Sequence, residues 1–120
     1  MATKSAKSPG EARSVIKQEQ WDMPVSFDTE GKLISLRDYA EGGHHALSFS
    51  SLSDDQRAEL AAHRIELQPS YEFATIGAGV VDKARALNEV RTKSKLGRTL
   101  MEIETRVIMH VIDEAKRRRN

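Results

Sequence analysis

The sequence predicts a small α+β domain of three to four short strands and three helices, with a long C-terminal helix and a flexible N-terminal tail. Three observations predict this fold. Short runs of alternating apolar and polar residues recur between residues 25 and 76, apolar residues at helical spacing fill residues 96–115, and residues 1–14 have no long aliphatic or aromatic side chain after Met1. A chain of 120 residues has the usual length of one domain.

The N-terminal 20 residues are expected to form a flexible basic tail, and residues 21–120 a single α+β domain. The first part of the tail is small, polar and basic, so it cannot bury enough apolar surface to offset the entropy lost on ordering. Residues 15–22 have room for one short helix, whose length Pro24 limits. Order is expected to begin near Trp21.

A β-hairpin is predicted at the start of the domain. Two short apolar runs, residues 25–27 and 33–36, flank a polar connection that has Gly31 near its end. This pattern is typical of two antiparallel strands joined by a loop of about four or five residues.

A loop or a single helical turn is expected over residues 37–45, and the alternation of residues 46–50 predicts a third strand. The best-marked helix start in the chain follows. Ser53 stands three residues before a glutamine, and the two side chains can form a capping box. This helix should run to about residue 67, because Pro69 stops it.

The clearest strand candidate is the alternating run at residues 71–76. The glycines of residues 77–79 are expected to end this strand and to form a turn that leads into a helix. A helix over residues 82–91 should follow, with Asp82 as its N-cap. Its predicted apolar stripe consists of Val80, Ala84, Leu87 and Val90.

The last helix is predicted to be long and to start near residue 95 or near residue 99. About twenty residues at about 1.5 Å each give a length on the order of 30 Å. Either the chain's own strands cover its apolar face, or a second copy or a partner helix does. The predicted oligomer or partner face is an a/d seam of Leu96, Leu100, Ile103 and Val107.

Composition excludes several classes of protein. The chain has no cysteine, which excludes disulfides, zinc–thiolate sites and cysteine nucleophiles. No apolar run approaches the roughly 20 residues of a membrane span, and no secretory signal is recognisable. We therefore expect a soluble, cytoplasmic protein with no membrane partner.

The formal net charge of +1 conceals an uneven distribution. Residues 1–20 carry a net +2, residues 21–82 a net −7 and residues 83–120 a net +6. Two interpretations compete. Either the basic C-terminal third docks onto the acidic middle of its own chain, or it forms a surface for an anionic partner such as nucleic acid.

The motifs that would support catalysis are incomplete. The glycines of residues 77–79 lack the third glycine of a dinucleotide-binding turn, and Asp82 stands in its place. No serine lies in a nucleophile elbow. The sequence therefore predicts no catalytic residue, no cofactor and no metal ligand. Whether a metal site is assembled in space from the histidines stays open; these are His44, His45, His63 and His110.

Six cations between residues 83 and 98 are opposed only by Glu89. The order of strand 71–76, helix 82–91 and the final helix is similar to that of ribbon-helix-helix proteins, a resemblance that implies a dimer bound to nucleic acid. The strand departs from that pattern, because it offers Glu72 and Thr75 where such proteins present polar or basic side chains to bases. The residues predicted to bind a partner or nucleic acid are Arg91, Lys93, Lys95, Arg98, Lys116, Arg117, Arg118 and Arg119.

The function that the sequence favours is that of a small, non-catalytic intracellular protein with a binding or regulatory role. It would act through a protein–protein interface on its C-terminal helices, with a protein partner or a second copy of itself. The first alternative is a nucleic-acid-binding protein that uses the basic segment 83–98 and the C-terminal lysine and arginine cluster. A third hypothesis is a small enzyme with a site that the sequence does not locate. No small-molecule ligand is expected.

Overall fold

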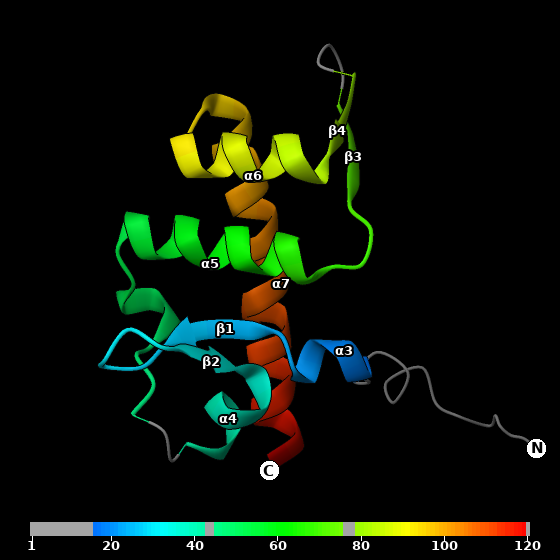
Figure 1. Cartoon of the computed structure of the whole chain (residues 1–120). Helices are drawn as coiled ribbons and strands as arrows, with labels where there is room; N and C mark the ends of the chain where they lie inside the picture. The colour runs from blue at the N-terminus through cyan, green and yellow to red at the C-terminus, as the bar shows by residue number, and fades with distance from the viewer. Residues whose placement is uncertain (1–15, 43–44, 76–78, 120) are drawn as a thin grey trace, which may run out of the picture.

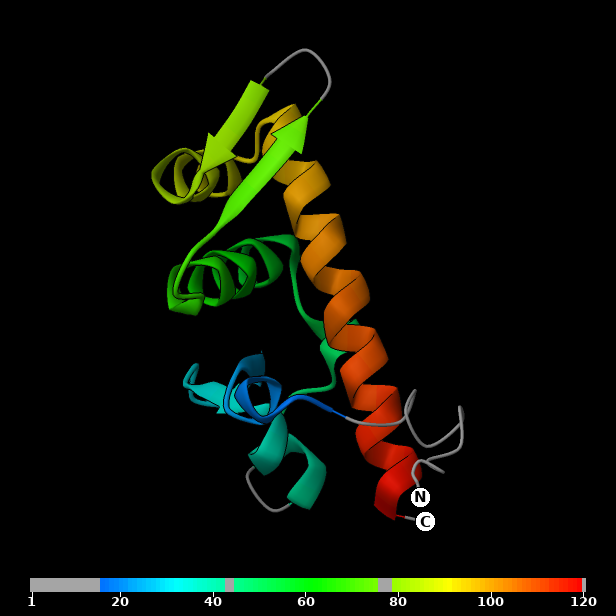
Figure 2. The ribbon, with the colours of Figure 1, turned by 90° about the vertical axis from the view of Figure 1, so that its right-hand side faces the viewer.

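A computed structural model describes residues 16–42, 45–75 and 79–119 of the chain. Its longest element is the helix α7, Lys95–Arg119, along which the other elements stack (Figure 1). Seen from the side in Figure 2, α6, α5, the sheet β1–β2 and α4 follow one another along one flank of α7. The α+β class and the long C-terminal helix are confirmed. No described helix is both long and apolar enough to span a membrane.

The N-terminal part of the domain contains α3 (Gln18–Trp21), β1 (Pro24–Phe27), β2 (Leu33–Ser35) and α4 (Leu36–Glu41). The predicted hairpin is confirmed, because β1 and β2 pair antiparallel. The Asp28 carboxylate closes its turn by accepting hydrogen bonds from the backbone N–H groups of residues 30 and 32, at 2.8 and 2.9 Å. The side chain of Ile16, which precedes Trp21 in the chain, is already buried.

The sequence predicts a third strand over residues 46–50, and the structure shows that this prediction is wrong. Ala46 forms a single antiparallel bridge with Asp28, and the chain then turns into the 3-10 helix η1, Phe49–Ser51. The cause is local. Ser51 donates to the carbonyl of Ser48 through both its backbone N–H, at 2.9 Å, and its hydroxyl, at 2.7 Å, so these groups are taken from a possible strand ladder.

The helix predicted from the capping box is α5, Asp54–Leu67. The Ser53 hydroxyl accepts from the backbone N–H of Gln56 at 3.1 Å, and the Gln56 side chain accepts from the backbone N–H of Ser53 at 2.8 Å. Both halves of the capping box are therefore present, and the prediction is confirmed.

The strand predicted at residues 71–76 is present as β3, Glu72–Thr75, but its continuation differs from the prediction. The chain returns as a second strand, β4 (Gly79–Asp82), which pairs antiparallel with β3. Val80 was assigned to a helical stripe and instead lies in β4 with 63% of its surface exposed. Two adjacent β-branched valines favour the extended backbone. Residues 77 and 78 of the predicted turn lie outside the described part of the chain.

The helix α6, Lys83–Thr92, begins at the predicted cap, where the Asp82 carboxylate accepts from the backbone N–H of Arg85 at 2.9 Å. A two-residue turn then leads into α7. Ser94 sets the start of α7 by accepting a hydrogen bond from the Gly97 backbone N–H at 2.9 Å, so the earlier of the two predicted starts is correct. A Cβ atom at Gly97 would overlap the backbone of residue 89, which shows how closely the two helices approach at their junction.

Two hydrophobic clusters form the core, and α7 contributes to both. The N-terminal cluster joins the β1–β2 layer to the C-terminal half of α7 and includes Val25, Leu36, Phe49, Leu60, Ile108 and Ile112. The helical cluster joins α5, β4 and α6 to the N-terminal half of α7 and includes Ala62, Ile65, Val81, Ala86, Val90 and Leu100.

A buried ion pair connects the elements of these two clusters. Arg64 of α5 is 1% exposed and donates to the Glu104 carboxylate of α7 at 2.9 Å. It also donates to the carbonyl of Pro24 at 2.6 Å and to the side-chain oxygen of Gln20 at 3.1 Å. One guanidinium therefore ties α5 to α7, β1 and α3, using the fixed fork of donors that only arginine offers.

Candidate interaction surfaces

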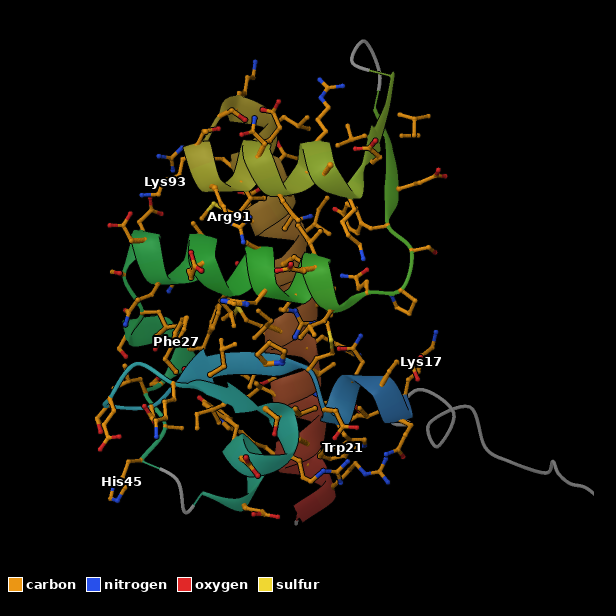
Figure 3. The ribbon with its side chains drawn as sticks, in the orientation of Figure 1. Lys17, Trp21, Phe27, His45, Arg91 and Lys93 are labelled. Atoms are coloured by element: carbon orange, nitrogen blue, oxygen red, sulfur yellow. The ribbon has the colours of Figure 1, made fainter. Side chains whose placement is uncertain are left out.

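The basic segment before and at the start of α7 faces the acidic helix α5. The Lys93 ammonium forms an ion pair with Asp55, and Arg98 lies 3.5 Å from the Asp54 carboxylate. Arg91 lies 4.0 Å from Glu66 near the other end of α5. Figure 3 shows Arg91 and Lys93 on the side of α6 that is turned toward α5. These three contacts support the interpretation in which the basic third neutralises the acidic middle of its own chain.

The ion pair with Lys93 affects the titration of its partner. The hydrogen bond and the positive charge of the Lys93 side chain hold the pKa of Asp55 below its ordinary value of 3.8. Of the other cations in segment 83–98, Lys83 donates to the carbonyl of Glu66 at 3.1 Å and Arg85 lies 3.7 Å from Glu89, whereas Lys95 is exposed and forms no ion pair with any described residue. Only part of this basic segment is thus left for an external anion.

The predicted seam of α7 lies along the edge of its buried face. Leu100 is fully buried, whereas Leu96, Ile103 and Val107 are partly buried and pack against the two clusters. The structure uses this seam in its own core. A role for the three partly exposed residues in an oligomer stays a prediction.

The C-terminal end of α7 carries a second group of cations. Arg117 donates to Glu114 at 2.6 Å, and its side chain is 71% exposed. Lys116 is exposed and has no ion-pair partner among the described residues. Arg118 is exposed as well, and the side chain of Arg119 lies outside the described part of the chain.

A groove of about 160 Å³ lies between α4, η1 and α7, and we call it the Tyr39 groove. Met109 is 55% exposed, while Phe49 and Ile112 are each 6% exposed. The Tyr39 hydroxyl contributes to the position of η1 by accepting from the Phe49 backbone N–H at 3.4 Å. The groove is lined by Tyr39, Ser48, Phe49, Ser50, Met109, Ile112, Asp113 and Lys116.

The polar residues of the Tyr39 groove are exposed and only partly engaged. The hydroxyls of Ser48 and Ser50 lie 3.0 Å apart. Asp113 and Lys116, three residues apart on α7, form no ion pair with each other or with another described residue. The groove therefore combines an apolar lining with a free carboxylate and a free ammonium group.

Neighbouring contacts keep the lining of this groove in place. The guanidinium of Arg57 lies over the Phe49 ring, 5.0 Å from its centroid, and donates to the carbonyl of Ser50 at 3.2 Å. The guanidinium thereby links the N-terminal half of α5 to η1. A second pocket, at the C-terminal end of α4, is lined by Tyr39, Gly42, His45 and Ala46, and among the described residues it has Tyr39 in common with the groove.

The described histidines and Trp21 lie in exposed or partly buried positions. His63 lies 3.2 Å from Glu59 on the surface of α5, and no described group of three or more histidine, aspartate or glutamate side chains is placed to hold a metal ion. His44 lies outside the described residues. Trp21 is partly buried against the N-terminal cluster, with the Arg37 guanidinium 6.0 Å from its ring centroid.

Tyr71 provides a pH-dependent reporter of the helical cluster. Burial, together with the nearby charge of Glu104, raises the pKa of its hydroxyl above the ordinary value of 10.0. The chain has two tyrosines, so the Tyr39→Phe variant leaves Tyr71 as the only one. We expect ultraviolet absorbance to show that this variant ionises at higher pH when folded than in urea.

The sign of the associated stability change follows from the raised pKa. The contribution of Tyr71 is fully present below pH 10.0 and is lost as the pH rises through the folded-state value. Identical titration curves for the folded and urea-unfolded Tyr39→Phe variant would contradict this prediction.

Sequence reasoning missed the Tyr39 groove, although it placed Lys116 on a binding surface. The sequence predicts a loop or a single helical turn around Tyr39 and a strand at Phe49, and Met109 on the last helix fits either a core contact or a partner contact. Helical spacing is the signal that could have found Met109, because its position lies away from the predicted seam. Comparisons of the chain with protein-family models, curated proteins and solved structures found no match.

Proposed function

We propose that this chain is a non-catalytic binding module that holds a protein partner on the C-terminal half of α7. The observation that carries this proposal is the Tyr39 groove, in which Met109 stays 55% exposed beside unpaired Asp113 and Lys116. An apolar site with a polar rim is the usual composition of a protein interface.

The rest of the exposed surface of α7 supports the choice of this region. The described exterior positions of the helix are otherwise occupied by polar residues such as Lys95, Thr99, Glu102 and Arg106. Met109 is the large apolar side chain that interrupts this polar surface. A partner that covers Met109 would also contact two charged groups, Asp113 and Lys116, that have no ion-pair partner among the described residues. The partner can therefore pair with them without breaking an existing ion pair of the domain.

Site-specific photo-crosslinking in a lysate of the source organism tests the proposal. A benzophenone amino acid that replaces Met109 should form a crosslink to one discrete protein. That protein should co-purify with the native chain but not with the Met109→Asp variant. The matched control places the same group at Lys95, which is also exposed on α7 but about 21 Å away along the helix. No discrete product at Met109, or the same products at both positions, would refute the proposal.

Nucleic-acid binding is the second candidate, and the exposed Lys116, Arg117 and Arg118 favour it. A random duplex in low-salt buffer tests it, because phosphate contacts make affinity fall steeply as salt rises. Under the protein-binding proposal, the duplex should not be retained. Tight retention that is lost on replacing these three cations with glutamine would favour this second function instead.

A further inference from the structure

We infer that the partner segment in the Tyr39 groove is an acidic stretch of polypeptide that places an apolar side chain against Met109 and a carboxylate against Lys116. This inference rests on the proposed function and deepens it by naming the chemistry of the partner. It combines three properties of the groove: its size, the charge around it and the limited exposure of its two aromatic rings.

The size of the groove suits one side chain rather than a whole small molecule. Its volume of about 160 Å³ equals the volume that about five molecules occupy in liquid water. Pockets for drug-sized ligands are larger, about 300–1,000 Å³. A single aliphatic side chain can contact Phe49, Met109 and Ile112 and exclude water from them.

The charge on the exterior of α7 favours an acidic segment. The exposed cations on the exterior of α7 are Lys95, Arg98, Arg106, Lys116, Arg117 and Arg118; against the exposed carboxylates Glu102 and Asp113 and the buried Glu114 that pairs with Arg117, they leave a net +3. At the C-terminal end of α7, Lys116, Arg117 and Arg118 carry three positive charges against the Asp113 and Glu114 carboxylates, and this net +1 exceeds the partial negative charge of about half a unit at a helix C-terminus. A nearby carboxylate on a partner would therefore be attracted to this end of the helix.

Lys116 is the cation that can pair with such a carboxylate without giving up an ion pair inside the domain. Its ammonium has no ion-pair partner among the described residues, whereas Arg117 is already engaged by Glu114 at 2.6 Å. Asp113, one helical turn earlier, is free to accept a backbone N–H of the bound segment. The two groups thus fit the two kinds of polar group that an acidic polypeptide brings.

The same groove suits a polypeptide better than a nucleic acid. Bases bind proteins by stacking on the exposed faces of aromatic rings, but Phe49 is only 6% exposed, and Tyr39, the other aromatic residue of the groove, is partly buried. Met109 instead offers a flexible apolar contact that adapts to aliphatic and aromatic side chains. An anionic partner that also brings an apolar side chain is an acidic protein segment.

Two short peptides test this inference on the full chain by nuclear magnetic resonance. The first is acetyl-Asp-Leu-Asp-Leu-Asp-amide, and the second has lysine in place of each aspartate. The acidic peptide should shift the backbone resonances of Ser50, Met109 and Lys116, and bind at least about fivefold more tightly than the basic one in low salt. This preference should shrink at about 0.15 M salt, because exposed charges are screened.

Matched charge reversals locate the effect. Lys116→Glu should weaken binding of the acidic peptide by about fivefold or more, whereas Lys95→Glu makes the same charge change on the same helix and should have little effect. Lys116→Met removes the charge without placing a new one near the helix end, and should also weaken binding. Equal binding of both peptides, or no response to either Lys116 variant, would overturn the inference.

The remaining outcomes separate this inference from the proposed function. If a partner is crosslinked at Met109 and binds the Lys116→Glu variant as well as the native chain, the proposed function stands. The inference that the partner segment is acidic is then overturned. Loss of both the crosslink and the peptide response overturns both. A random DNA duplex that shifts the same resonances and displaces the acidic peptide also overturns the inference, in favour of nucleic acid.

Discussion

Replacing Arg64 with methionine should lower the free energy of unfolding by about 3–5 kcal/mol, the cost typical of removing one partner from a buried ion pair. The variant leaves the Glu104 carboxylate, whose side chain is 8% exposed, without the cation that accompanies it. It also removes the donors to the Pro24 carbonyl and to Gln20, so three elements lose a contact with α5. Urea denaturation followed by circular dichroism measures the change.

Two further variants distinguish a lost ion pair from a general effect of methionine. Arg91→Met removes an exposed cation 4.0 Å from Glu66 and should cost less than about 1 kcal/mol. The double variant Arg64→Met/Glu104→Leu should recover much of the lost stability, because no buried charge is left without a partner. Equal costs for Arg64→Met and Arg91→Met would show that the buried network contributes little.

The Gly97→Ala variant should be less stable than the native chain, by about 1–3 kcal/mol or more. In an ordinary helix interior the same change stabilises by about 1 kcal/mol, so even the sign of the result is informative. The reversal follows from the crossing of α6 and α7, where a Cβ atom at residue 97 would overlap the Glu89 carbonyl and lie 2.9 Å from the backbone nitrogen of Val90. Because these neighbours are backbone atoms, a rotamer change cannot relieve the overlap.

Thr99→Ala is the matched control for Gly97→Ala. It introduces alanine in the same turn of α7 at an exposed position, and should be neutral or slightly stabilising. Thermal unfolding of the two variants and the native chain gives the comparison. A Gly97→Ala variant that unfolds at a higher temperature than the native chain would mean that α6 and α7 do not approach this closely.

The elements that the sequence predicts correctly are those with strong local signals. The capping box at Ser53 and the side-chain cap at Asp82 depend on residues only three positions apart, so they can be recognised without knowledge of the fold. The strand β4 was missed for the opposite reason. Val80 also fits the apolar spacing of the helix that follows, and only its pairing with β3 shows that it belongs to a strand.

The candidate site is less accessible to sequence reasoning because it is assembled from distant segments. Tyr39, Phe49 and Met109 meet only after α4 and η1 have packed against α7. Arg64 presents the same difficulty, since a cation within a helix is normally exposed and this one is buried. Charge alone identifies the basic segment in the sequence. It does not show that the acidic residues at the two ends of α5 lie opposite this segment in the fold.

The way α7 is shared between the two clusters also constrains the order of folding. The N-terminal cluster combines residues near the start of the domain, such as Val25, with Ile108, Val111 and Ala115. On a ribosome, the hairpin β1–β2 and α4 must therefore wait for the last turns of α7 before their apolar side chains can be covered. The helical cluster is made from residues much closer together in the chain, and loop closure there costs less entropy. We expect α5, α6 and the first half of α7 to assemble first and the N-terminal layer to dock last.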